Sequence, residues 1–100
     1  MIESNWQAHS SHHYSLKGTV DRDTVPGIWG HIQTWTPSEK SIKVDLSQLK
    51  RVDSAGLVLL LHLLEHAKKS NCHIMLDSVP DHLLTLIQLS NVELLIADHI

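Results

Sequence analysis

Apolar and polar positions repeat along this chain with two different periods, and these periods predict strands that alternate with helices. Apolar side chains at every second position indicate half-buried strands, and apolar side chains three and four residues apart indicate helices that cover a core. The strands predicted in this way cover residues 6–8, 13–18, 41–46 and 73–76. The predicted helices cover residues 25–35, 54–70 and 80–90.

The remaining segments are predicted from their local chemistry. Residues 47–53 form a short polar turn between a strand and the longest helix, and Gly18 begins the segment that leaves the second strand. Residues 92–96 are either a last short strand or an extended tail. Helices that follow strands connect neighbouring parallel strands by right-handed crossovers. The sequence therefore predicts an α/β fold: a small mixed sheet of four to five strands, an antiparallel edge from the first hairpin, and helices mainly on one face.

The seam between the turn and the longest helix reads Asp53-Ser54-Ala55-Gly56-Leu57. Ser54 is the predicted N-cap of this helix, and capping alone explains a serine here. A hydroxyl and free N–H groups at a helix N-terminus can also hold a phosphate or accept a polar group of a partner. Asp53 is either a turn residue or a contact for a partner's basic or backbone group. Gly56 costs about 1 kcal/mol inside a helix relative to alanine, so the close approach of another backbone is a candidate reason for it.

Five consecutive apolar residues, 57–61, are more than the apolar stripe of a helix on one sheet face requires. Leu57, Leu60, Leu61 and Leu64 are predicted to face the sheet. The other apolar positions of this helix, Val58, Leu59 and Leu63, then face neighbouring helices, with any remainder forming a patch for a partner. Trp29 and Trp35 do not both fit the centre of so small a core, and tryptophan is favoured in interface hot spots. Trp29 is therefore a candidate partner-binding residue.

Composition narrows the class of protein. The chain has 100 residues, so we expect one domain spanning 1–100, and its 42% hydrophobic content without phenylalanine predicts an aliphatic core. The net charge of -3 and the scattered basic residues argue against a nucleic-acid surface. The single cysteine, Cys72, excludes an intrachain disulfide and fits a reducing compartment. The first residues do not have the pattern of a signal peptide, and the longest apolar run is too short to span a bilayer, so we expect a cytoplasmic protein without membrane insertion.

The sequence contains no recognisable catalytic motif. It lacks a glycine-rich phosphate loop, and its order of residues does not indicate a Ser-His-Asp arrangement. His62 and His66 are four residues apart on one helix, but Glu65 is displaced by one position from the zinc-protease pattern. A solvated histidine face is the preferred interpretation. We therefore expect neither an enzyme nor a bound metal or cofactor.

Three groups of residues resemble one known family, that of the STAS domains. The resemblance covers nearly the whole chain. These groups are Leu16-Lys17-Gly18-Thr19-Val20-Asp21, then Asp45-Leu46-Ser47 with Arg51-Val52-Asp53, and then Gly56-Leu57-Val58-Leu59-Leu60-Leu61-His62-Leu63-Leu64 with Ala67-Lys68-Lys69. The family includes anti-sigma factor antagonists, regulatory domains attached to transporters, and a subunit of a phospholipid-trafficking ABC transporter of Gram-negative bacteria. The likeness is closest to the last group, on the leucine-rich helix that ends in Ala67-Lys68-Lys69.

The resemblance implies a non-enzymatic subunit that binds a cytoplasmic ATPase. Through that ATPase it would join a permease and lipid-binding subunits at the inner membrane, in a system that maintains outer-membrane lipid asymmetry. The expected partner-binding residues are Asp53, Ser54, Gly56, Leu57 and Trp29. The alternative is an anti-sigma factor antagonist that is switched by phosphorylation of Ser54. The transporter group usually has a threonine at this position, and Ser54 keeps its hydroxyl.

Overall fold

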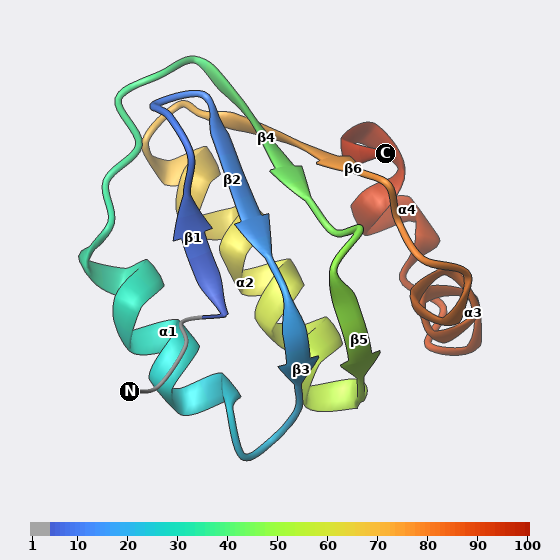
Figure 1. Ribbon diagram of the computed structural model, residues 1–100. Helices are drawn as coiled ribbons and strands as arrows, with labels where there is room; N and C mark the ends of the chain where they lie inside the picture. Colours follow the sequence, from blue (N-terminus) through green and yellow to red (C-terminus); the bar gives the residue numbers. More distant parts are fainter. Residues whose placement is uncertain (1–4) are drawn as a thin grey trace.

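Four strands form the main sheet of the computed structural model, which describes residues 5–100 (Figure 1). Their order across the sheet is β1 (Trp6–Ala8), β2 (His13–Leu16), β4 (Ser41–Asp45) and β6 (His73–Asp77). β1 pairs with β2 antiparallel, whereas β2, β4 and β6 run parallel. The predicted mixed sheet with an antiparallel edge is thus confirmed. Residues 1–4, which were part of the signal-peptide expectation, lie outside the described residues.

A second, two-stranded ladder extends the fold beyond the prediction. β3 (Gly18–Val20) pairs in parallel with β5 (Leu49–Val52), in the segments expected to be a strand exit and a polar turn. The expectation of a simple turn was wrong. Lys50 and Arg51 are exposed, as they would be in a polar turn, but they belong to a strand whose first residue, Leu49, is buried. Gly18 has a φ of 75° at the bend between β2 and β3, a conformation that favours glycine.

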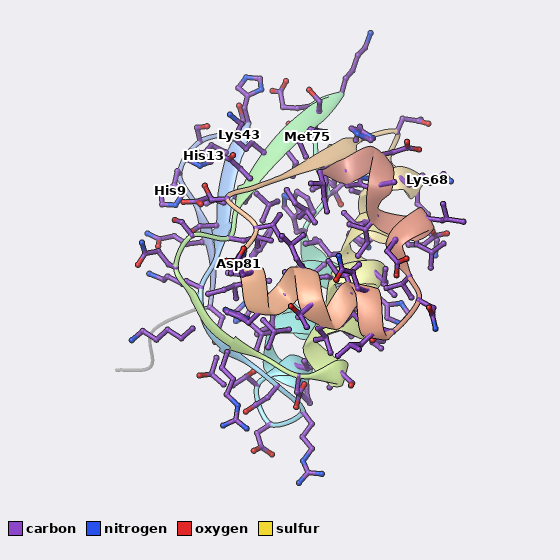
Figure 2. All side chains as sticks on the ribbon, turned by 90° about the vertical axis from the view of Figure 1, so that its right-hand side faces the viewer. His9, His13, Lys43, Lys68, Met75 and Asp81 are labelled. Carbon is purple, nitrogen blue, oxygen red and sulfur yellow. The ribbon has the colours of Figure 1, made fainter. Side chains whose placement is uncertain are left out.

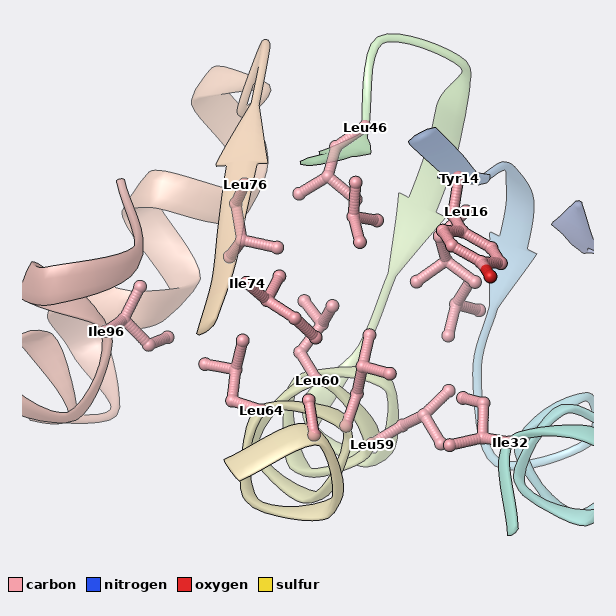
Figure 3. Packing of buried hydrophobic residues seen from close by; sticks show 14 of the residues in the cluster. Tyr14, Leu16, Ile32, Leu46, Leu59, Leu60, Leu64, Ile74, Leu76 and Ile96 are labelled. Atoms are coloured by element: carbon pink, nitrogen blue, oxygen red, sulfur yellow. The ribbon is translucent and has the colours of Figure 1, made fainter. Parts of the chain in front are cut away.

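Helices α1 (Val25–Thr34) and α2 (Ser54–Lys69) lie side by side on one face of the main sheet (Figure 1). Helix α3 (Asp81–Leu89) packs against α2 and β5. In Figure 3, Leu59, Leu60 and Leu64 of α2 project toward the sheet and α1, where they meet buried residues such as Leu16 and Ile74. Among residues 5–100, no helix has the length and apolar character needed to cross a membrane.

The C-terminal segment is helical, which corrects the expected strand or extended tail. Residues 93–96 form α4 (Glu93–Ile96), and a 3-10 helix, η1, covers Ala97–His99. Ile96 is fully buried in the core. His99 lies beside β6 without pairing as a strand, and its Nδ1 is 2.6 Å from the carbonyl oxygen of Ile74. A second bond joins the same two segments, since His73 Nε2 of β6 lies 2.8 Å from the carbonyl oxygen of Asp98. These two bonds hold the C-terminal segment against β6.

Among residues 5–100, no helix covers the other face of the main sheet (Figure 1). Side chains alternate along the strands, so that Ile42 and Val44 of β4 are buried under the helices while Lys43 between them is exposed. Figure 2 shows His9, His13 and Lys43 on the side of the sheet away from α2. The prediction of helices mainly on one face is confirmed.

Candidate functional site

Asp53, and not Ser54, is the N-cap of α2. Its backbone is extended (φ -105°, ψ -171°), and its Oδ1 accepts a hydrogen bond from the backbone N–H of Gly56 at 3.0 Å. This is the usual bond from an N-cap side chain to the third helical residue. The predicted capping role of Ser54 was wrong by one position: Ser54 is already the first helical residue, and its side chain is exposed.

The Asp53 carboxylate has a second partner that sequence reasoning missed. The backbone N–H of Arg22 donates to Asp53 Oδ2 at 3.3 Å from the loop before α1. Hydrogen bonding, first of all by the Gly56 N–H, lowers the pKa of Asp53 below its ordinary value. Asp53 is therefore a charged group that ties the start of α2 to the loop 31 residues earlier. No local pattern points to this contact, since its donor is a backbone group.

Gly56 is at a point of very close approach between α2 and β3. A Cβ atom at this position would lie 2.2 Å from the carbonyl oxygen of Val20 and 2.8 Å from Cγ1 of Val52. Real Cβ atoms essentially never come so near to another heavy atom. The expected reason for this glycine, approach of another backbone, is confirmed. The contact sets the height of the α2 N-terminus above β3 and β5.

The candidate residues of α2 differ in their access to solvent. Ser54 is exposed and Asp53 is partly exposed, so both side chains can meet a partner. Gly56 is buried, and Leu57 is only 3% exposed within the core. The surface at the start of α2 is thus made by a hydroxyl and a carboxylate, and the two buried residues determine where these groups stand.

Trp29 lies farther along the α1–α2 pair. Its ring packs against His62 and His66 of α2, with ring centroids 5.6 and 6.1 Å apart. His62 is eight residues after Ser54, which corresponds to about 12 Å along a helix. Trp29 and the two histidines line a shallow groove of about 260 Å³ together with Gln33, Glu65 and Lys69. The structure therefore places Trp29 on this groove and not in the turn that contains Asp53 and Ser54.

The predicted solvated histidine face holds for His62, which is exposed, but not for His66. His66 is partly buried, and its Nε2 lies 2.6 Å from the carbonyl oxygen of Trp35 at the end of α1. Trp35 itself donates from Nε1 to the Tyr14 hydroxyl at 3.0 Å and packs against Trp6. As expected, neither Trp29 nor Trp35 is fully buried in the core. His66 and Trp35 instead lock α1 onto α2.

Within residues 5–100, no three His, Cys, Asp or Glu side chains are grouped so that they could hold a metal ion. Cys72 is buried, and this burial raises the pKa of its thiol, which disfavours the nucleophilic thiolate. At the start of α2 the described residues place an exposed hydroxyl beside a partly exposed carboxylate.

A mixed sheet with helices on one face is the fold of a known family of domains. The family described as "Mlab, STAS domain" matches residues 6–97 of this sequence. The chain belongs to the STAS domain family, in agreement with the resemblance of its motifs.

Two relatives are similar over most of their length. Each is an "Intermembrane phospholipid transport system binding protein MlaB", one from Escherichia coli (strain K12) and one from Shigella flexneri. Each is 37% identical over 82 residues, which cover 78% of this chain and 78% of the relative.

Solved structures agree with this fold. A sulfate transporter family protein from Wolinella succinogenes has a TM-score of 0.69 at 17% identity, covering 88% of this chain and 73% of that protein. The anti-sigma factor antagonist SpoIIAA in its unphosphorylated form has a TM-score of 0.64 at 18% identity, covering 84% of this chain and 80% of that protein. At these identities the likeness shows the fold alone.

Proposed function

We propose that this chain is the non-enzymatic STAS subunit of an ABC-type phospholipid transport system, and that it binds and stabilises the cytoplasmic ATPase subunit. The observation that carries the proposal is the 37% identity over 82 residues to two MlaB proteins of intermembrane phospholipid transport. In this proposal ATP is bound and hydrolysed by the partner. The chain reaches the inner membrane only through the complex, and lipid asymmetry of the outer membrane is the process that it serves.

The start of α2 supplies the groups with which the ATPase is oriented. The exposed Ser54 hydroxyl can donate and accept a hydrogen bond, and the Asp53 carboxylate attracts a basic or N–H group of the partner. Gly56 and Leu57 act from below, because their packing against β3 and the core holds Ser54 in position. The half-buried Trp29 ring adds apolar contact area on the neighbouring groove.

The experiment is co-purification of Ser54 variants with the ATPase subunit. Because Ser54 is exposed and does not cap the helix, Ser54→Arg should keep the melting temperature of the free protein. The long cation should block docking by its bulk and by its unpaired charge in the interface. Ser90→Arg is the matched control, because Ser90 is an exposed serine at the end of α3.

We expect Ser54→Arg to lose co-purification while Ser90→Arg retains it. If Ser54→Arg melts like the unmodified chain and still binds the ATPase with unchanged affinity, the docking surface lies elsewhere. A second measurement tests the non-enzymatic assignment. The pure chain should not hydrolyse ATP, and turnover that is lost on substitution of one of its own residues would contradict the assignment.

A second candidate function uses the same residue. Ser54 offers an exposed hydroxyl at the first position of a helix, where a phosphate group is favoured by the helix dipole. This observation favours an anti-sigma factor antagonist that is switched by a partner kinase. Mass spectrometry of the chain isolated from its own cells tests it: a phosphate on Ser54 that disappears in Ser54→Ala supports switching, and unmodified Ser54 under all growth conditions counts against it.

A further inference from the structure

A polar hollow lies on the open face of the sheet, opposite to the helices, and neither Asp53 nor Ser54 lines it. Its volume is about 410 Å³, which is within the usual range for small-molecule pockets. β1, the end of β2, the end of β4 and β5 all contribute to its lining. Figure 2 labels His9 and Lys43 on this open side of the sheet. His9 lines the hollow, whereas Lys43 does not. Neither the proposed docking to an ATPase nor the proposed phosphorylation of Ser54 uses this face.

The floor of the hollow is a buried hydroxyl. Ser15 of β2 is only 4% exposed, and it is the one buried polar residue of the described chain. It lies between Gln7 of β1 and Asp45 of β4 in the register of the sheet. Its Oγ is 2.9 Å from Nε2 of His9, so the hydroxyl and the imidazole are already oriented toward each other. Such a hydrogen-bonded pair provides a preorganised polar contact for a bound group.

The charges around this floor favour an anion. Lys17 and Lys50 both line the hollow, in a chain whose net charge is -3. Asp45 is the one acidic side chain of the lining, and both of its carboxylate oxygens accept hydrogen bonds from Ser47, at 2.9 Å from the backbone N–H and 3.0 Å from Oγ. Each carboxylate oxygen of Asp45 therefore already accepts one hydrogen bond from Ser47. The Lys50 ammonium can donate to a bound anion, and the Ser15–His9 pair keeps one further O–H or N–H for such a bond.

We propose that this hollow binds a phosphate group, either of a soluble phosphate monoester or of a lipid headgroup. Phosphate oxygens accept several hydrogen bonds, and bonds from charged donors are the strong ones. Lys50 provides charge from β5, and the hydrogen-bonded pair of Ser15 in β2 and His9 just after β1 provides a directed contact. The site is separate from Ser54, so it survives or fails independently of the proposed docking to the ATPase.

The test is a titration of the isotope-labelled chain with inorganic phosphate, followed by amide chemical shifts at constant ionic strength. Lys50→Gln removes charge from the hollow, and Ser15→Ala removes the hydroxyl of the floor. Lys43→Gln is the matched control, because Lys43 is an exposed lysine on the same open face and does not line the hollow. A thermal melt of each variant shows that the fold is kept.

We expect saturable shifts of the Ser15, Gln7 and Asp45 amides that survive in Lys43→Gln. Affinity should fall about tenfold in Lys50→Gln, the ratio that corresponds to about 1.4 kcal/mol, and it should also fall in Ser15→Ala. Two further probes separate the sources of the phosphate. Binding of glycerol 3-phosphate without binding to anionic phosphatidylglycerol vesicles assigns a soluble monoester, and vesicle binding that depends on Lys50 assigns a lipid headgroup. Shifts that do not saturate, or that are the same in Lys50→Gln as in Lys43→Gln, would overturn the proposal.

Discussion

Replacing Gly56 by alanine tests the closest contact between α2 and the β3–β5 ladder. The new methyl group would lie 2.2 Å from the Val20 carbonyl oxygen and 2.8 Å from Val52 Cγ1. The Val20 oxygen also accepts a hydrogen bond from the Asp53 N–H at 3.3 Å, so it cannot move away without disturbing the start of α2. The helix must therefore lift from the strands, or the ladder must shift.

Two opposing effects set the size of this change. Alanine is favoured over glycine inside a helix by about 1 kcal/mol. Overpacking at a site that cannot relax costs about 1–3 kcal/mol, and occasionally more. A backbone oxygen at this distance belongs to the severe end of that range, so we expect a net loss of about 2 kcal/mol in the free energy of unfolding. For a chain of this length the melting temperature should fall by roughly 8–16 °C.

The assay is thermal and urea unfolding followed by circular dichroism, with Gly30→Ala as the matched control. Gly30 is also in the interior of a helix, α1, but a Cβ atom there would meet nothing within 4 Å. Gly30→Ala should therefore stabilise the chain by about 0.4–1 kcal/mol. If Gly56→Ala is as stable as the original chain while Gly30→Ala behaves as expected, the close approach at Gly56 does not constrain the fold.

Two further predictions concern the core and the cap of α2. Leu63→Ala should lower the free energy of unfolding by about 2–5 kcal/mol, because Leu63 is fully buried, whereas Val58→Ala at a 49% exposed position should change it by less than about 0.5 kcal/mol; equal effects in urea unfolding would refute the assigned burial. The Asp53 carboxylate has a lowered pKa in the folded chain, so its charge stabilises the fold above the ordinary pKa of 3.8 and loses this effect as the pH falls through the folded value. The stability difference between the original chain and Asp53→Asn should therefore shrink with acid, and a difference that is constant between neutral and strongly acidic pH would contradict the charged cap.

The sequence by itself determined those elements whose signal is local. The alternation along β4 and the spacing of leucines in α2 follow from periods of two and 3.6 residues, which any short window reveals. The role of Gly56 could also be predicted from the sequence. A glycine inside a helix needs a compensating reason, and the candidate was the close approach of another backbone, which the structure shows at Val20. The family could be identified from the same segments, since its motifs lie where β4 ends and α2 begins.

Tertiary structure decided the features that depend on a partner far away in the chain. β5 became a strand because β3 lies beside it, although Lys50 and Arg51 resemble a polar turn. Asp53 became the cap of α2 with an additional bond from the Arg22 backbone, which moved Ser54 to the exposed first position of the helix.

The C-terminal segment and the aromatic groove show the same limit. A short apolar run such as 92–96 fits a strand or a helix equally well by its period, and the choice fell to burial of Ile96 and to the bonds of His73 and His99 along β6. Trp29 was placed over His62 and His66 by the packing of α1 on α2, not by its spacing within α1. Periodicity reports which side of an element is buried, but the neighbour that buries it is a property of the whole fold.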